Sequence, residues 1–312
     1  MSHRDTFLHL SVIAVLFAAF FVLPAYHSGS LARIMVLAIY AMGYNLAFGY
    51  TGLLSLGHAL FFAAGMYGLG LTMQLGGWAA IPAFALALVA SLVVAGVVGV
   101  LALRTRGVGF MIVTLMFAQA GYLTALYFVQ YTRGDEGFVI DQAARAIGPA
   151  DLSSEAGRYF AALFLFAVTL LVIGALVRAP FGRTLIAIRE NEARATMLGY
   201  DVQRLKWIAL VVSGTISGAA GAAYALLFGY AGASFAGVQY SIFPLLYVLL
   251  GGAGTTLGPL IGAIFMFYLI DLSSGITNAY MLIAGVVLVL LTMFLPHGIL
   301  GTLRKRALPW LP

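Results

Sequence analysis

Long apolar runs separated by short polar stretches make up most of this sequence. A helix needs about 20 mainly apolar residues to cross a bilayer. Seven runs approach or exceed that length, at residues 7–25, 31–49, 55–75, 78–103, 108–130, 159–177 and 207–230. Three more follow at 241–252, 257–270 and 283–295, and the first of these is too short to cross in full. The pattern predicts an all-α polytopic transmembrane helical bundle of about ten membrane segments, with at least one short or broken helix.

The composition also indicates a membrane protein. Hydrophobic residues make up 63% of the chain and charged residues 8%, whereas soluble domains average about 45–50% and 25%. We expect a single transmembrane domain over residues 1–312. The chain has no cysteine, which excludes disulfides and thiolate metal sites. The net charge of +6 follows the membrane topology, so we expect no nucleic-acid partner.

The main charged interruption in the second half of the chain is the segment 178–206. It holds nine charged residues. Because one charge at the centre of a bilayer costs about 2.5–3.5 kcal/mol, the segment must lie in water.

Local signals within this segment predict short helices. Pro180 is placed to start one helix, and Gly199 is placed to end one in a left-handed conformation. Asp201 is placed to cap the next helix. Glu190 and Arg194 have the spacing of a helical ion pair. We therefore predict a hairpin of short helices that docks on a partner, with an ordinary solvated loop as the alternative.

The distribution of basic residues predicts the orientation. With the N-terminus in the cytoplasm, alternating crossings put 104–106, 178–206 and the C-terminal tail at 297–312 on the same side as the N-terminus. That side carries twelve basic and four acidic residues, whereas the opposite loop at 132–158 is net acidic. The positive-inside rule therefore predicts a cytoplasmic N-terminus and C-terminus, with 132–158 outside.

Two glycine-rich stretches interrupt the apolar pattern. The first, at 49–58, predicts an unwound helix that presents backbone groups, Ser55 and His58 to a passing polar solute. Close packing of His58 against a backbone carbonyl is the alternative.

The second glycine-rich stretch follows the short apolar run. It predicts a hinge, because glycine absorbs large changes in backbone angles. If the stretch is helical, three of its glycines, spaced four residues apart, lie on one face. The alternative to a hinge is static close packing of that face against a neighbouring helix. The hinge or packing residues are Gly251, Gly252, Gly254, Gly258 and Gly262.

Five segments together resemble one family. They are GYTGLLSLGHALFF at 49–62, RTRGVGFMIVTLMFAQ at 104–119, the charged loop at 180–198, LLGGAGTTLGPLIGA at 249–263 and FLPHGILG at 294–301. In order and spacing they are similar to the branched-chain amino-acid ABC transporter permease family, and in particular to its M-type membrane subunit. The resemblance covers nearly the whole chain.

The resemblance implies a transport subunit rather than an enzyme, with no cofactor, in the cell inner (plasma) membrane. It implies half of a translocation path for branched-chain or related small amino acids, completed by a second homologous permease. Two ATP-binding subunits would sit below the pair, and a periplasmic substrate-binding protein would deliver solute from above. The segment 178–206 then matches the coupling loop of the family. The expected ATPase contacts are Arg183, Arg189, Glu190, Glu192, Arg194 and Gly199.

One stretch departs from the family pattern. Family members often carry a TGG-x-x-G-L-like sequence after the fifth span, and the corresponding residues here are 132–138. Arg133 and Glu136 are unusual there. The solute therefore stays open among branched-chain amino acids, urea, short amides and small organic acids.

Other classes of protein fit the sequence less well. A self-powered ATPase needs a GxxxxGK[ST] loop, and neither Lys206 nor Lys305 lies in one. An ion-coupled secondary carrier, the more distant alternative, usually has acidic residues deep in its spans. Here Asp271 lies at the end of its run, where an interfacial role is favoured.

We expect uncharged polar groups along the translocation path, because a fixed charge would trap a zwitterionic solute. The side chains expected to face the cavity between the two permeases are Asn45, Ser55, His58 and Gln119.

Overall fold

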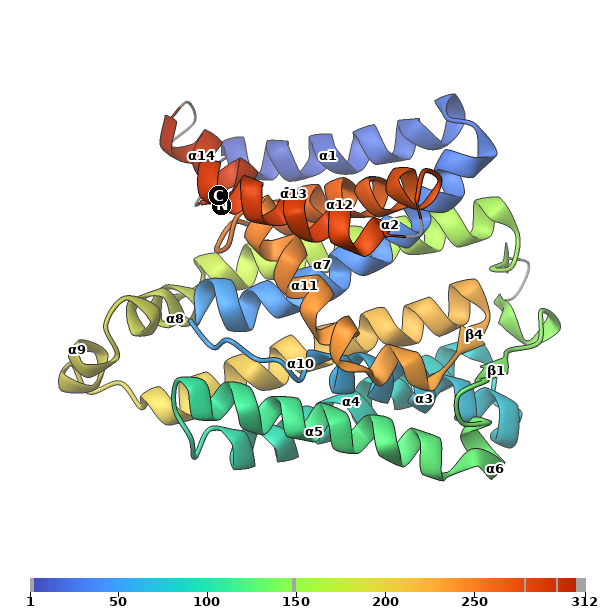
Figure 1. The fold of residues 1–312 in the computed structure, drawn as a ribbon, viewed down its shortest axis with the longest axis horizontal. Coiled ribbons are helices and arrows are strands. Elements are labelled where there is room, and N and C mark those ends of the chain that lie inside the picture. The colour runs from blue at the N-terminus through green and yellow to red at the C-terminus, as the bar shows by residue number, and fades with distance from the viewer. Residues whose placement is uncertain (1–2, 148–149, 278, 296, 307–312) are drawn as a thin grey trace.

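The computed structural model describes residues 3–147, 150–277, 279–295 and 297–306, and it is a bundle of helices (Figure 1). Ten of its helices correspond to the ten predicted apolar segments, which confirms the polytopic all-α fold. They are α1 (His3–Val22), α2 (Ala25–Asn45), α3 (His58–Gly76), α4 (Ala80–Ala102), α5 (Val108–Tyr127), α7 (Glu155–Arg178), α10 (Val202–Phe228), α11 (Val238–Gly251), α12 (Gly258–Ser274) and α13 (Tyr280–Phe294).

Six segments are long and apolar enough to cross a membrane, namely α3, α4, α5, α7, α10 and α2 with its extension to Tyr50. The shorter apolar helices are α1, α11, α12 and α13. Several helix boundaries differ from the predicted runs by a few residues, for example in α2 and α3. The run predicted at 31–49 is already helical from Ala25, directly after Pro24, and the run predicted at 55–75 becomes helical only at His58.

Shorter elements connect these helices. They are the π-helix η1 (Leu46–Tyr50), α6 (Val129–Thr132), the 3-10 helix η2 (Ala143–Arg145), α8 (Pro180–Glu190), α9 (Glu192–Met197), the 3-10 helix η3 (Ala233–Ala236) and α14 (Gly298–Arg306). Strand β1 (Phe138–Val139) pairs antiparallel with β4 (Tyr230–Ala231), and β2 (Ala146–Ile147) pairs with β3 (Ala150–Asp151). The first pair attaches the loop after α6 to the end of α10.

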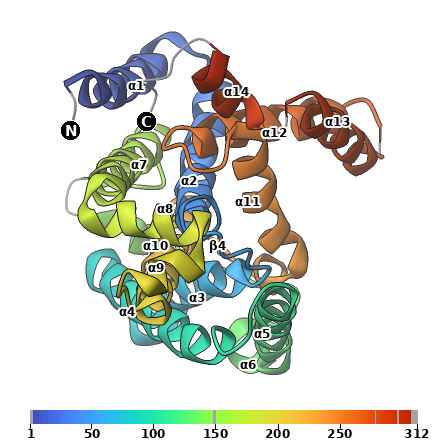
Figure 2. The ribbon, with the colours of Figure 1, turned by 90° about the vertical axis from the view of Figure 1, so that its left-hand side faces the viewer.

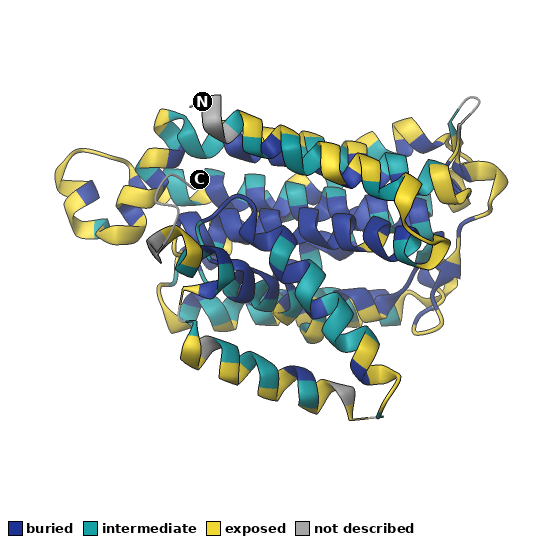
Figure 3. Cartoon of the chain, turned by 90° about the horizontal axis from the view of Figure 1, so that it is seen from above, coloured by how far each residue is buried: buried dark blue, intermediate teal, exposed yellow. Residues whose placement is uncertain are grey.

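Helix α2 lies at the centre of the bundle and packs against α7, α10, α11 and α12 (Figure 2). Within its most apolar window 83% of the residues are buried. Buried residues concentrate in the central helices, while outward faces are exposed (Figure 3). Those exposed faces are apolar, for example at Phe21 of α1 and Met293 of α13, as expected for surfaces that contact lipid.

Helices α3 and α10 approach each other so closely that only glycine fits between them. A Cβ atom on Gly65 would overlap the carbonyl oxygen of Gly218, and a Cβ on Gly221 would overlap that of Phe62. Close backbone contact of this kind replaces hydrophobic burial as the source of helix association in lipid.

The two ends of the bundle differ. Helices α8, α9 and α14 and the connection from α4 to α5 lie at one end, whereas α6 and β1 lie at the other (Figure 1). The basic segments that the sequence placed together are therefore at the same end of the molecule.

Gly221→Ala is predicted to destabilise the protein by about 1–3 kcal/mol, because the added methyl group overpacks the contact between α3 and α10. The matched control is Gly285→Ala in α13, where a Cβ meets no atom within 4 Å. The measurement is the thermal unfolding temperature of the purified protein in detergent. Equal unfolding temperatures for the two variants would contradict the packing described here.

Candidate coupling loop and broken-helix junction

The charged segment 178–206 folds as predicted into two short helices. Pro180 is the first residue of α8, and Gly199 has a positive φ of 86°. The Oδ1 atom of Asp201 accepts a hydrogen bond from the Arg204 amide at 3.0 Å and caps α10. We call this segment the coupling loop.

The predicted helical ion pair between Glu190 and Arg194 is wrong. The helix breaks at Asn191, whose φ and ψ are −157° and 99°, so the two charged residues belong to different helices. Asn191 caps α9 instead, because its Oδ1 accepts from the Arg194 amide at 2.9 Å. Glu192 pairs with Lys206, with 2.5 Å between Oε2 and Nζ.

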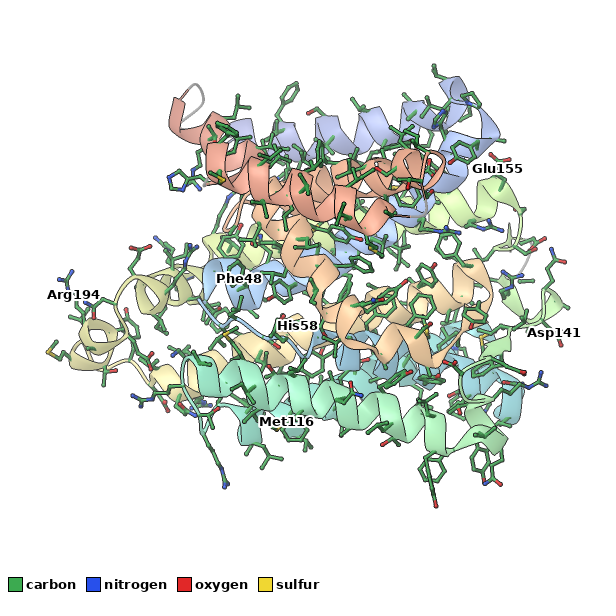
Figure 4. All side chains as sticks on the ribbon, viewed as in Figure 1. Phe48, His58, Met116, Asp141, Glu155 and Arg194 are labelled. Carbon is green, nitrogen blue, oxygen red and sulfur yellow. The ribbon has the colours of Figure 1, made fainter. Side chains whose placement is uncertain are left out.

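The outer surface of the coupling loop combines charge with apolar area. Arg183, Glu190 and Arg194 are exposed, and Arg194 points away from the bundle (Figure 4). Met197 is 82% exposed and Leu198 is 72% exposed, with Tyr200 exposed beside them in sequence. The three residues 197, 198 and 200 form an apolar tip that the sequence analysis missed.

Arg189 differs from the other charged residues of the loop because its guanidinium turns toward the bundle. It donates a hydrogen bond to the carbonyl oxygen of Gly49, at the end of the π-helix η1. Its Nη1 atom lies so close to Gly254 that a Cβ there would be 3.0 Å away. Arg189 therefore joins the coupling loop to two segments in the middle of the molecule.

Both of those segments are interruptions of helices. The first consists of the π-helix η1 and the non-helical residues 51–57, and it ends where α3 begins at His58. The second runs from 252 to 257, between α11 and α12. Gly252 and Gly254 have positive φ angles of 124° and 76°, which side-chain-bearing residues rarely adopt. We call the two segments together the broken-helix junction, and they confirm the predicted breaks.

Asn45, the last residue of α2 before the first segment, is hydrogen-bonded to the second segment. Its Nδ2 atom donates to the Thr255 carbonyl at 2.9 Å, and its Oδ1 atom accepts from the Gly254 amide at 3.0 Å. A Cβ on Gly49 would overlap the same Oδ1 atom, so Gly49 leaves the space that the amide group occupies. One side chain at the end of α2 thus pairs two backbone groups of the second break.

His58 is fully buried at the start of α3 (Figure 4). Its Nε2 atom lies 2.8 Å from the Ser213 hydroxyl, which donates to the Gly43 carbonyl at 2.6 Å. Because that hydroxyl has one proton, the hydrogen-bond network assigns the proton of the ring to Nε2. Ser55 is also fully buried, and its hydroxyl accepts from the Gly57 amide at 3.2 Å.

The four residues expected along the path do not gather at one surface. Asn45, Ser55 and His58 lie in the interior of the chain, whereas Gln119 is exposed on α5. A cavity of about 350 Å³ lies near the coupling loop, lined by Gly52 of the junction and by Arg106, Glu192, Gln203 and Lys206 among others.

The glycines in and around the second break fall into two groups: some allow close helix packing, and others form the turn. A Cβ on Gly251 would overlap the Gly258 carbonyl, and a Cβ on Gly262 would overlap the Tyr247 carbonyl, so α11 and α12 meet backbone to backbone. The predicted face of three glycines is wrong at Gly254, which precedes α12 and lies in the turn.

Comparison with known proteins identifies the family of this chain. The family described as "Branched-chain amino acid transport system / permease component" matches residues 26–294. The chain belongs to this family. Its members by this description are transport permeases, and the matched region spans the coupling loop and the whole broken-helix junction.

The similar proteins include branched-chain amino-acid permeases. The high-affinity branched-chain amino acid transport system permease protein LivM of Escherichia coli is 29% identical over 300 residues, which cover 87% of this chain and 69% of that protein. The ribose import permease protein RbsC of Haemophilus influenzae is 33% identical over 131 residues, covering 39% of this chain and 40% of that protein. No solved structure matches this chain significantly.

Cysteine substitution tests the burial of the expected path residues. In the resting protein, Gln119→Cys is expected to react with a small membrane-impermeant thiol reagent, whereas Ser55→Cys is expected to be protected. The chain has no cysteine of its own, so the wild-type protein is the background control. Rapid labelling of Ser55→Cys at rest, or no labelling of Gln119→Cys in any nucleotide state, would contradict this placement.

Proposed function

We propose that this chain is a membrane-spanning permease subunit of an ABC importer and forms half of a translocation path. The other half is a second homologous permease. Two ATP-binding subunits bind at the end that carries the coupling loop, and a periplasmic substrate-binding protein delivers solute to the opposite end. The observation that carries the proposal is the coupling loop, which exposes a docking surface on one side and reaches the broken-helix junction on the other.

The solutes we propose are branched-chain or related small amino acids. Two relatives with that description align over 87% of the chain, and a third aligns over 33%. The ribose permease and the autoinducer 2 import system permease protein LsrC of Klebsiella pneumoniae align over 39% and 29% of it. The longer similarity favours amino acids over sugars.

The proposed location is the cell inner membrane, with both ends of the chain on the cytoplasmic side. The supporting observation is that the basic segments lie together at one end of the bundle, with the coupling loop among them. This is the distribution that the positive-inside rule associates with the cytoplasm.

The docking surface has two parts. The apolar tip inserts into a groove of the ATPase, and the charges of Arg183, Glu190 and Arg194 set its orientation. Burial of exposed apolar side chains in an interface supplies affinity. Charges at the rim of the interface fix the relative orientation of the two subunits.

Movement of the ATPases then acts on the centre of the permease. When the coupling loop shifts, Arg189 displaces Gly49. The second break follows because Asn45, one helical turn before Gly49, is hydrogen-bonded to that break. The junction bends at Gly252 and Gly254, where no side chain resists rotation. Ser55 and His58 would become accessible in that state, together with the already exposed Gln119.

Reversing two charges tests the docking surface. The double variant Glu190→Arg/Arg194→Glu keeps the net charge of the loop, but it presents the wrong signs to the ATPase. We expect uptake per assembled permease to fall about tenfold or more, with membrane insertion unchanged.

The matched control is Arg133→Glu/Glu136→Arg, which makes the same exchange in the loop at the opposite end. Uptake of radiolabelled leucine by vesicles that contain the complete importer is the measurement. Normal uptake by the coupling-loop variant, or equal losses in both variants, would show that these charges do not dock the ATPase.

A further inference from the structure

Arg33 is an exposed charge on the most deeply buried helix. The residues beside it in α2, Ala32 and Ile34, are 1% and 0% exposed, yet Arg33 itself is exposed. It lies eight residues after the start of the helix, or about 12 Å along its axis. An ionisable residue inside a membrane span is costly, and proteins keep one there when it faces a water-filled space and a solute.

The neighbours of Arg33 lie at the end of the bundle opposite the coupling loop, which we call the external mouth. Its Cζ atom lies 5.1 Å from the ring centre of Phe228, the last residue of α10. The phenols of Tyr224 in α10 and Tyr240 in α11 also lie within electrostatic range of its guanidinium. Among the described residues, no hydrogen-bond acceptor or carboxylate pairs with its guanidinium. The charge is therefore available to a ligand.

Two further arginines surround the same end of α10. The Cζ atom of Arg158 lies 5.6 Å from the ring centre of Phe228, and its Nη2 donates to the Ser153 carbonyl at 3.0 Å. Arg145 is buried, with its Nη1 atom 3.4 Å from the Leu227 carbonyl that accepts from it.

The positive charge at this mouth is only partly neutralised. Burial and the charge of Arg158 lower the pKa of the Arg145 guanidinium, while Asp151 acts in the opposite direction. The carboxylate of Glu155 accepts a hydrogen bond from the Ser28 hydroxyl. Arg33, Arg145 and Arg158 thus form a cationic surface. Among the described residues, the Arg33 guanidinium has no hydrogen-bond acceptor or carboxylate as partner.

Aromatic rings continue inward from this surface. Phe228 is 4.8 Å from Tyr224, Tyr224 is 4.9 Å from Phe235, and Phe235 is 4.6 Å from Tyr240, measured between ring centres. The Tyr40 hydroxyl, two turns below Arg33 on α2, donates to the Tyr240 carbonyl at 2.8 Å. Phe228, Tyr224 and Tyr240 are only partly buried. The mouth is cationic at its surface and aromatic beneath.

We propose that Arg33, beside Phe228, binds the carboxylate of a small apolar amino acid at the external mouth of this subunit. The aromatic rings below receive the apolar side chain of the same molecule. A guanidinium fits a carboxylate through two parallel hydrogen bonds, which a lysine ammonium does not reproduce. This inference rests on the proposed function, and it narrows the solute to one that bears a carboxylate. Urea and simple amides lack that group.

The test uses vesicles that contain the complete importer, with leucine as the probe and the binding protein titrated up to saturation. Arg33→Gln is expected to reduce uptake about tenfold or more, because it removes the charge-assisted hydrogen bonds to the carboxylate. Arg33→Lys keeps the charge but loses the paired geometry, so a loss of about threefold is expected. The matched control is Arg133→Gln, an exposed arginine of the external loop, which is expected to leave uptake unchanged.

The outcomes separate this inference from the proposed function. If wild-type vesicles take up no amino acid, the proposed function fails. If wild-type vesicles transport leucine and an assembled Arg33→Gln importer does so equally well, only the inference fails. Recovery of the lost uptake at higher binding-protein concentration would also overturn it, because Arg33 would then dock that protein. If Arg33→Gln does not assemble, Arg33→Lys decides, and wild-type uptake by that variant overturns the inference.

Discussion

Backbone amide and carbonyl groups need partners inside a bilayer, and this requirement governs the centre of the molecule. Two helices break there, and each break frees groups that a continuous helix would pair. Side chains from other helices supply the partners: Asn45 binds Gly254 and Thr255, the Thr114 hydroxyl accepts from the Leu56 amide, and the Ser241 hydroxyl accepts from the Ala59 amide. The two breaks are therefore held by specific contacts rather than by helix geometry.

One of these partners comes from outside the apolar core. The Gly49 carbonyl accepts its bond from Arg189, which belongs to the coupling loop. A shift of the loop must either break that bond or move the junction with it. The same geometry gives the charged residues of the loop different roles. Arg183, Glu190 and Arg194 are exposed, whereas the Arg189 guanidinium is hydrogen-bonded to Gly49.

The sequence predicted the ten apolar segments because span length and hydrophobicity are local properties. It also predicted the helix start at Pro180 and the cap at Asp201, which depend on neighbouring residues only. It missed the helix break at Asn191, where the cap of α9 competes with continuation of α8. The inward turn of Arg189 and the exposure of Arg33 depend on helices distant in sequence, so no local pattern reveals them. For Arg33 the sequence does contain one signal, because it is a single charge within an apolar run.

The most direct test of the account is the amount of leucine transported per ATP hydrolysed by an importer that carries Arg189→Gln. Arg183→Gln on the same helix is the control, because it affects docking without touching the junction. We predict that Arg189→Gln keeps its ATPase subunits bound and hydrolysing ATP, while the leucine moved per ATP falls about tenfold, as expected for loss of one charge-assisted contact. Arg183→Gln should keep the wild-type ratio in the complexes that assemble. A wild-type ratio in the Arg189→Gln importer, or loss of its ATPase subunits, would contradict the link between the coupling loop and the broken-helix junction.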